Sequence, residues 1–200
     1  MPITMMKNDP ISTLHKDIAA CRLCAAHLPL GPRPIVRFGA SARLVIVGQA
    51  PGSKVHQSGV PWDDNSGDRL RDWLGLSNDV FYDASRVALM PMGFCYPGKG
   101  RSGDLPPRKE CAPEWHDSIL KLLPAVHLML LVGSHAQAYY LRGDGRSMTD
   151  RIRAFRSFLP HFFPLPHPSW RSTKWVRDND WFESDVLPAL RAEVRKCTAP

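Results

Sequence analysis

The chain alternates short, continuous apolar runs with longer stretches in which apolar residues recur at helical spacing. The apolar runs are RLVIVG at 43–48, RVALM at 86–90 and HLMLLVG at 127–133, with a weaker one at Phe162–Leu165. Apolar residues that are continuous rather than alternating are typical of strands covered on both faces. We therefore predict an α/β fold with three α/β/α layers and a central, mainly parallel, four-stranded sheet.

The stretches between the predicted strands carry helix start and stop signals. Ser66 is the predicted cap of one helix, because a serine hydroxyl can accept a hydrogen bond from a free backbone amide, and Gly75 closes that helix. The predicted helices are Met6–His27, opening near Asp9-Pro10, Ser66–Leu74, about Pro113–Leu123, the segment SHAQAYYL at 134–141, and about Trp181–Lys196. We expect a single domain over residues 1–200.

Composition and charge narrow the range of partners. The 200 residues include 26 Lys and Arg against 19 Asp and Glu, which gives a net charge of +7. This excess favours a polyanionic partner such as nucleic acid. No apolar run is long enough to span a membrane, and the N-terminus lacks the apolar core of a signal peptide. We therefore expect a cytoplasmic protein, and we expect it to be a monomer.

The predicted sheet places the candidate site. In open parallel sheets, ligands bind beyond the carboxyl ends of the strands. Those ends are Gly48, Met90, Gly133 and Leu165. Four loops should therefore meet there: GQAPG with its continuation to residue 64, the stretch 91–95, GSHAQ at 133–137 and HPSW at 167–170.

These loops carry short motifs that are informative in combination. GQAPG at 48–52, followed by GVPW at 59–62, resembles the first motif of the uracil-DNA glycosylase superfamily, a Gly-x-x-Pro turn that leads to an aromatic residue after a Gly-x-Pro. PHPS at 166–169 resembles the second motif, and GSHAQ resembles the Gly-Ser loop of the classical branch. The resemblance covers about residues 21–190. It implies hydrolysis of the N-glycosidic bond of a damaged base, chiefly uracil, flipped out of DNA.

The cysteines indicate a branch of that superfamily. Cys21 and Cys24 form a C-x2-C pair, while Cys95 and Cys111 lie in a proline-rich loop. This resembles the iron–sulfur branches, families four and five, and so implies a structural 4Fe-4S cluster held by the four thiolates. Zinc also accepts four thiolates, and buried cysteines need no metal, so both alternatives stay open. Cys197 is left over, and we expect it to be inert.

The resemblance also assigns two side chains to the departing base. Breaking the bond leaves positive charge on the sugar and negative charge on the base, so a donor must face the base oxygen. The PHPS motif implies that His167 is this donor, acting as a neutral imidazole. Trp62 stands where the superfamily places an aromatic residue that stacks on the flipped base.

The catalytic carboxylate departs from the usual pattern. The turn GQDPY of the classical branch and the turn GEAPG of family four contain an acid, whereas this chain has Gln49 and Ala50 there. Family five places a carboxylate just before a Ser-Gly instead. In WDDNSG that position is Asp64, with the neighbouring Asp63 as a second catalytic candidate. We predict that Asp64 orients the water, although an acid before Ser66 is also typical of helix capping, and the two roles are compatible.

Base selection departs from the pattern as well. Family four and the classical branch read uracil with an asparagine at the end of the second strand, where this chain has Pro91. We therefore predict looser specificity, with xanthine, hypoxanthine or ethenocytosine as extra substrates. The predicted substrate-binding residues are Gly48, Gln49, Ala50, Trp62, Pro91, Met92 and Gly93. The predicted DNA contacts are Ser134, Ser169, Trp170, Arg171, Lys174 and Arg108.

The sequence thus favours a monofunctional DNA glycosylase that removes uracil, and other deaminated bases as well, at the start of base excision repair. Two alternatives remain. One is a glycosylase specific for a deaminated purine. The other is a non-catalytic iron–sulfur protein that binds DNA lesions, which the missing motif carboxylate makes conceivable.

Overall fold

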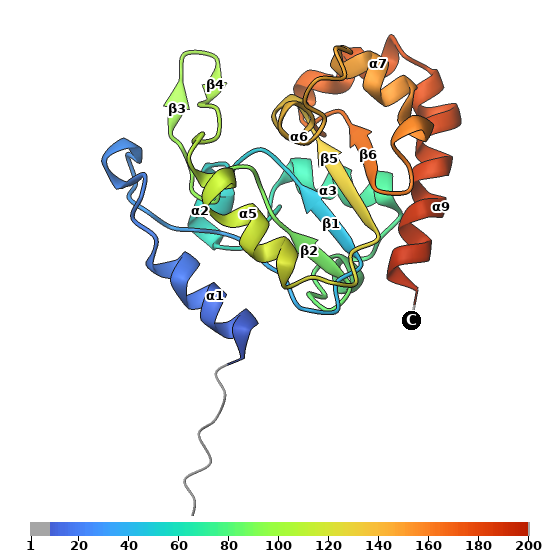
Figure 1. Cartoon of the computed structure of the whole chain (residues 1–200). Helices are drawn as coiled ribbons and strands as arrows, with labels where there is room; N and C mark the ends of the chain where they lie inside the picture. Colours follow the sequence, from blue (N-terminus) through green and yellow to red (C-terminus); the bar gives the residue numbers. More distant parts are fainter. Residues whose placement is uncertain (1–8, 200) are drawn as a thin grey trace, which may run out of the picture.

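A four-stranded parallel sheet forms the centre of the protein (Figure 1). The structure is a computed structural model and describes residues 9–199. Strands β1 (Leu44–Val47), β2 (Val87–Leu89), β5 (Leu128–Val132) and β6 (Phe162–Leu165) pair in the order β2-β1-β5-β6, and every pairing is parallel. The predicted fold class and strands are confirmed, with strand ends within about one residue of the apolar runs.

Helices cover both faces of this sheet. Their bounds are α1 (Pro10–Ala20), α2 (Ser53–Ser58), α3 (Asn65–Leu74), α4 (Asn78–Phe81), α5 (Cys111–Lys121), α6 (Ser134–Tyr140), α7 (Met148–Arg153), α8 (Thr173–Arg177) and α9 (Leu187–Thr198). Short helical turns lie at Ala25–His27, Phe155–Phe158, Trp170–Ser172 and Phe182–Val186, and a hairpin pairs β3 (Lys99–Gly100) with β4 (Gly103–Asp104). None of the helices within residues 9–199 is long and apolar enough to cross a membrane.

The two faces of the sheet bury two separate apolar clusters. In β1, Leu44 and Ile46 belong to the cluster on the side of α3 and α9. Val45 and Val47 belong to the cluster on the side of α1 and α5. Successive side chains of a strand point to opposite faces, so an uninterrupted apolar run is what both cores require. Burying one such side chain contributes about 1.5–3 kcal/mol.

The N-terminal helix is shorter than predicted. It begins at Pro10, capped by Asp9, and ends at Ala20, where the extended backbone of Cys21 breaks the helical path. The prediction that the helix continues through the C-x2-C pair to His27 is therefore wrong, and both cysteines lie in the loop that follows it. Residues 6–8 of the predicted helix lie outside the described part of the chain.

Other helix ends also differ from the prediction. The cap of α3 is Asp64 rather than Ser66, because the Asp64 Oδ1 accepts the hydrogen bond of the Gly67 amide at 2.9 Å. Gly75 ends that helix in the left-handed conformation, as predicted. The last helix begins with a wider π turn at Phe182–Val186 and continues as α9 to Thr198.

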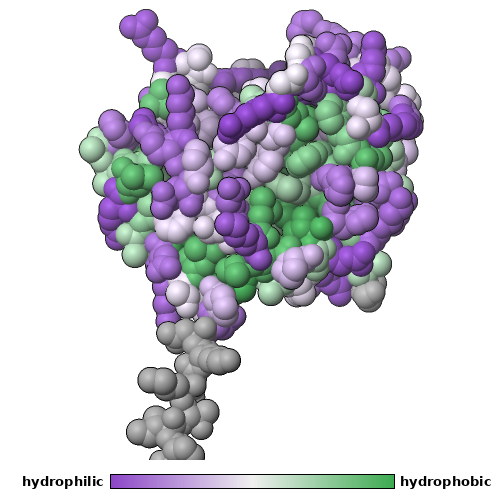
Figure 2. Space-filling model, viewed as in Figure 1, coloured by the Kyte–Doolittle hydropathy of each residue, from purple (hydrophilic) through white to green (hydrophobic). Residues whose placement is uncertain are grey.

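The molecular surface is mainly hydrophilic on the face shown in Figure 2, with an apolar area below its centre. Within the described residues, the exposed large apolar side chains are Leu23, Leu30, Leu105 and Trp170. Leu105 and Trp170 both line the cavity that opens at the carboxyl ends of the strands. Exposed apolar groups beside a cavity often mark a binding surface.

Candidate active site

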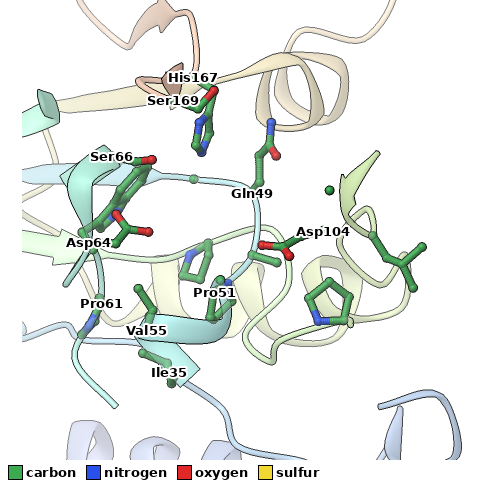
Figure 3. Close-up of a pocket in the computed structure, with 18 of the residues that line it drawn as sticks. Ile35, Gln49, Pro51, Val55, Pro61, Asp64, Ser66, Asp104, His167 and Ser169 are labelled. Carbon is green, nitrogen blue, oxygen red and sulfur yellow. The ribbon is translucent and has the colours of Figure 1, made fainter. Parts of the chain in front are cut away.

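A cavity of about 410 Å³ lies at the carboxyl ends of the strands (Figure 3). The loop after β1 lines it from Gly48 to Gly52, the loop after β2 contributes Pro91, and the loop after β6 contributes His167 and Ser169. The loop after β5 does not line the cavity but contacts Gln49, which does. Gly133 lies so close that a Cβ atom on it would be 2.9 Å from Gln49 Nε2. The predicted convergence of the strand-end loops is thus seen in the structure.

Trp62 is held in an unusual backbone conformation at the edge of this cavity. Its φ of 59° lies in the left-handed region, which costs a residue other than glycine about 1–3 kcal/mol. Gly67 makes the conformation possible, because a Cβ atom there would lie 1.7 Å from the Trp62 carbonyl oxygen. The same oxygen accepts a hydrogen bond from Arg71 at 3.3 Å. The start of α3 therefore fixes the direction of the indole.

The indole of Trp62 lies between the first motif and the second. A Cβ atom on Gly48 would approach the ring to 2.6 Å, so glycine is required where β1 ends. On its other side the indole stacks with His167, with 5.8 Å between the ring centroids and 29° between the ring planes. The two aromatic side chains that the motifs suggested thus line one cavity together.

His167 is neutral at physiological pH. Burial lowers the pKa of its imidazole to about 4, more than the neighbouring Asp64 carboxylate raises it. The loop is also fixed: the Ser172 hydroxyl donates to the His167 carbonyl at 2.7 Å, and Arg69 donates to the Ser169 carbonyl at 3.1 Å. A neutral imidazole on a fixed loop can donate a hydrogen bond to charge that develops in the cavity.

Asp64 both caps α3 and lines the cavity. Its Oδ1 bonds the Gly67 amide, whereas its Oδ2 lies 3.9 Å from the position that a Cβ atom on Gly52 would occupy. Asp63, the neighbouring candidate, is exposed and is not among the residues that line the cavity. The geometry therefore favours Asp64 of the two, and it combines the capping role with a place in the site.

The predicted substrate-binding residues divide into two groups. Gly48, Gln49, Ala50, Trp62 and Pro91 line the cavity, whereas Met92 and Gly93 do not. Gly93 instead packs against the segment 107–108: a Cβ atom on Gly93 would lie 3.1 Å from the Pro107 side chain. The chain turns away from the cavity directly after Pro91.

A buried histidine holds the Pro91 carbonyl. His116 is completely buried, and its Nε2 lies 3.0 Å from the Pro91 oxygen while its Nδ1 lies 2.7 Å from the Tyr140 hydroxyl. Burial lowers the pKa of His116 to about 4, so the ring is neutral. A neutral ring that donates from Nε2 and accepts at Nδ1 satisfies both partners. Pro91 is thereby fixed at the wall of the cavity.

The predicted DNA contacts also divide. Ser169, Trp170 and Arg171 line the cavity, and Trp170 is 79% exposed. Ser134, Lys174 and Arg108 do not line it. Lys174 forms an ion pair with Asp178, and Arg108 forms one with Glu110.

The wall of the cavity formed by the β3–β4 hairpin was not predicted from the sequence. The β3–β4 hairpin supplies Gly103, Asp104 and Leu105, and α2 supplies Val55. The hairpin has only two residues in each strand, so its sequence lacks the alternation that would reveal it. The sequence of this loop shows only that it is rich in proline and glycine. In the structure it places the carboxylate of Asp104 in the site.

A second, much smaller recess gathers the four cysteines. Cys21, Cys24, Cys95 and Cys111 line it together, with Phe94 and Trp115 among its apolar walls. Burial, reinforced by the neighbouring thiols, raises the pKa of Cys111 to about 12. Burial also raises the pKa of Cys24 and Cys95, so these three thiols need a bound cation to become thiolates. No group of three or more His, Cys, Asp or Glu within residues 9–199 is arranged to hold a single metal ion.

Comparison with known proteins identifies the family. Residues 36–191 match the family described as the Uracil DNA glycosylase superfamily. The chain belongs to this superfamily. A solution NMR structure from Methanosarcina acetivorans, provisionally named a uracil DNA glycosylase, is also similar, at 15% identity over 78% of this chain and 93% of that chain, with a TM-score of 0.39. As a member of the uracil DNA glycosylase superfamily, the chain is expected to act on DNA, and the match includes every residue that lines the cavity except Ile35.

Proposed function

We propose that the protein is a monofunctional DNA glycosylase that hydrolyses the N-glycosidic bond of uracil flipped out of DNA, with other deaminated bases as further substrates. Membership of the superfamily supports the reaction class. The observation that carries the proposal is the meeting of a neutral His167, the Trp62 indole and the Asp64 carboxylate in one cavity. The product, an abasic site, would start base excision repair.

The proposed reaction divides between the base and the sugar. As the bond between C1′ and N1 breaks, its electrons move to the base, and negative charge grows on the uracil oxygen. His167 donates a hydrogen bond to that oxygen, an interaction that strengthens only as the charge develops. Asp64 stabilises the positive sugar, orients the attacking water and accepts its proton when the new C1′–O bond forms.

The remaining residues hold the DNA. Trp62 offers an aromatic surface for the extruded base, which contributes about 1–3 kcal/mol of stacking. The exposed Trp170 side chain suits a wedge that occupies the vacated space in the duplex, and Arg171 beside it suits a phosphate contact. Because these contacts are partly ionic, DNA affinity should fall as salt concentration rises.

We further propose that the cysteine recess holds a 4Fe-4S cluster. The donor set fits: the four thiols line one apolar recess together. In a cubane each thiolate binds a different iron atom, so the thiols need not crowd around one point as they must for a single zinc ion. The cluster would supply a structural link between residues 21–24 and the loop 95–111. It lies outside the catalytic steps.

The test is excision by matched variants of neighbouring acids. Asn is a good helix cap, so Asp64→Asn removes the charge while it preserves the start of α3. We expect its excision rate on a uracil oligonucleotide to fall by about 100-fold or more, whereas Asp63→Asn should stay within about twofold of wild type. A large loss of excision in Asp63→Asn with little loss in Asp64→Asn would show that Asp63 orients the attacking water.

Wild-type activity decides between the proposed function and its alternatives. Protein that binds uracil-containing DNA but never produces an abasic site would support a non-catalytic lesion-binding protein. Excision of hypoxanthine or xanthine without uracil would support a glycosylase specific for deaminated purines. Iron and sulfide analysis of freshly purified protein separately tests the cluster.

A further inference from the structure

Asp104 brings a second carboxylate to the cavity from the side of the β3–β4 hairpin. Figure 3 shows its side chain pointing toward the cavity, across from Asp64. A Cβ atom on Gly52 would lie 3.4 Å from Asp104 Oδ2 and 3.9 Å from Asp64 Oδ2. The two oxygens therefore lie within 7.3 Å of each other. The proposed catalytic steps use only Asp64.

The orientation of Asp104 is fixed by a tyrosine. The Tyr96 hydroxyl donates to Asp104 Oδ1 at 3.3 Å, and the Tyr96 side chain is buried. Burial, and then the charge of Asp104, raises the pKa of Tyr96, so the phenol retains its proton and remains a donor. With Oδ1 bonded in this way, Oδ2 faces the cavity and is free to accept a hydrogen bond from a ligand.

The hairpin that carries Asp104 is itself tied to the rest of the site. The Leu105 amide donates to the Gly98 carbonyl at 2.8 Å, which closes the base of the hairpin. Arg171, from the loop after β6, donates to the Ser102 carbonyl at its tip. Asp104 is therefore held between two anchored ends rather than on a free loop.

The chemistry of a carboxylate indicates which group of a base could donate a hydrogen bond to Asp104. Uracil has an N–H at N3 beside a carbonyl group, and hypoxanthine has one at N1. Their parent bases, cytosine and adenine, have an unprotonated ring nitrogen with a lone pair at the same position. An ionised carboxylate only accepts hydrogen bonds, so it attracts the N–H and repels the lone pair. Such a group distinguishes a deaminated base from its parent.

We infer that Asp104 is a specificity-determining residue that accepts a hydrogen bond from the ring N–H that a base gains on deamination. The inference rests on the proposed function and names its substrate class. Other groups of the cavity suit this task less well. The Pro91 carbonyl is already bonded to His116, and no hydrogen bond within residues 9–199 orients the Gln49 amide, so this amide can present either its donor or its acceptor to a base.

The experiment compares Asp104→Asn with wild type on oligonucleotides that each contain one uracil, hypoxanthine, cytosine or adenine. With its oxygen bonded to the Tyr96 hydroxyl as Asp104 Oδ1 is, the asparagine amide presents its NH2 group to the cavity, and this group donates to a lone pair and repels an N–H. We expect kcat/KM for uracil to fall by about 10- to 100-fold and the preference for uracil over cytosine to fall with it. Asp72→Asn, an exposed acid on α3, makes the same change in net charge and should leave both values unchanged.

Three outcomes are decisive. Unchanged uracil kinetics in Asp104→Asn, or an equal loss for every base excised, would overturn the inference, and an equal loss would indicate that Asp104 acts on the water. Wild-type protein that excises nothing would count against the proposed function instead. Binding then tests Asp104 alone: wild type should prefer uracil-containing over cytosine-containing DNA, Asp104→Asn should not, and equal preference in both would overturn the inference.

Discussion

The active-site cavity and the cysteine recess lie on the same domain but differ in size and lining. The cavity measures about 410 Å³ and is lined by acids, a histidine and hydroxyl groups. The recess measures about 20 Å³ and is lined mainly by thiols and apolar side chains. A site that receives and releases a substrate needs open space, whereas a site that holds a permanent group closes around it. The first suits a visiting base and the second a resident cluster.

One loop connects the two regions. After β2 it lines the cavity at Pro91, enters the recess at Cys95, returns to the cavity with Asp104 and reaches the recess again at Cys111. A cluster bound by Cys95 and Cys111, as proposed above, would fix both ends of the segment that carries Asp104. The cysteine recess can affect the active site through this loop without contributing a group to the chemistry.

The largest predicted effect is in the cavity. His167→Ala should lower the rate of uracil excision by about 100- to 1,000-fold, since it removes the donor that faces the developing negative charge. Thermal unfolding should change far less than the rate, because His167 packs at the edge of the core rather than within it. A rate within tenfold of wild type would assign the donor role to another group.

Substitution in the recess should reverse that pattern. Cys95→Ser should remove iron from the purified protein and lower Tm by about 10 °C or more, because metal binding contributes folding free energy. Cys197→Ser is the matched control. Cys197 is buried in the apolar cluster on the side of α3 and α9, away from the recess, so its replacement should leave the iron content unchanged. Equal iron content in both variants would contradict the assignment of the cluster.

A smaller steric change tests the contact between the motifs. Gly48→Ala should displace the Trp62 indole, because the new Cβ atom would lie 2.6 Å from the ring. We expect excision to fall by about 10-fold through lost stacking. Tryptophan fluorescence should change with it, and an unchanged emission spectrum with full activity would show that the ring is not held there.

Acid should weaken the fold through the two neutral histidines. His167 and His116 both have a pKa near 4 in the native protein, below the ordinary value of 6.5. The unfolded chain therefore binds protons first as the pH falls, so stability is full above pH 6.5 and declines toward pH 4, by up to about 3 kcal/mol for each histidine. Urea unfolding of wild type and His116→Gln between pH 7.5 and 4.5 measures the difference in slope. Excision that needs neutral His167 should show no inflection near pH 6.5.

The smallest predicted effects concern the DNA-facing cations. Arg171→Ala should weaken DNA binding and reduce the salt dependence by about one counterion. Lys174→Ala should change the affinity by less than twofold, because Lys174 pairs with Asp178 and does not line the cavity. Binding titrations at several salt concentrations compare the two.

The sheet and the meeting of the loops could be predicted because apolar continuity and strand order are local properties of the sequence. The position of Asp64 could be predicted too, although its bond to Gly67 showed that it, and not Ser66, caps the helix. The end of the first helix could not, because the backbone becomes extended at Cys21 although residues 18–24 contain neither glycine nor proline to mark a stop.

The contribution of the hairpin was also beyond prediction from the sequence. Tyr96 orients the Asp104 side chain within the hairpin loop, and Arg171, which lies 69 residues from Ser102 in the chain, holds the hairpin tip over the cavity. The same reasoning explains Met92 and Gly93: they follow Pro91 directly, yet His116 holds the Pro91 carbonyl at the wall and the chain turns toward the recess. Long-range contacts decided each of these positions.

The most direct measurement of the central claim is a single-turnover excision assay on an oligonucleotide that contains one uracil. Freshly purified wild-type protein should convert it to an abasic site that alkali cleaves, and Asp64→Asn and His167→Ala should each slow this conversion by about 100-fold or more while they still bind the oligonucleotide. Conversion at the wild-type rate by both variants would contradict a catalytic role for the cavity.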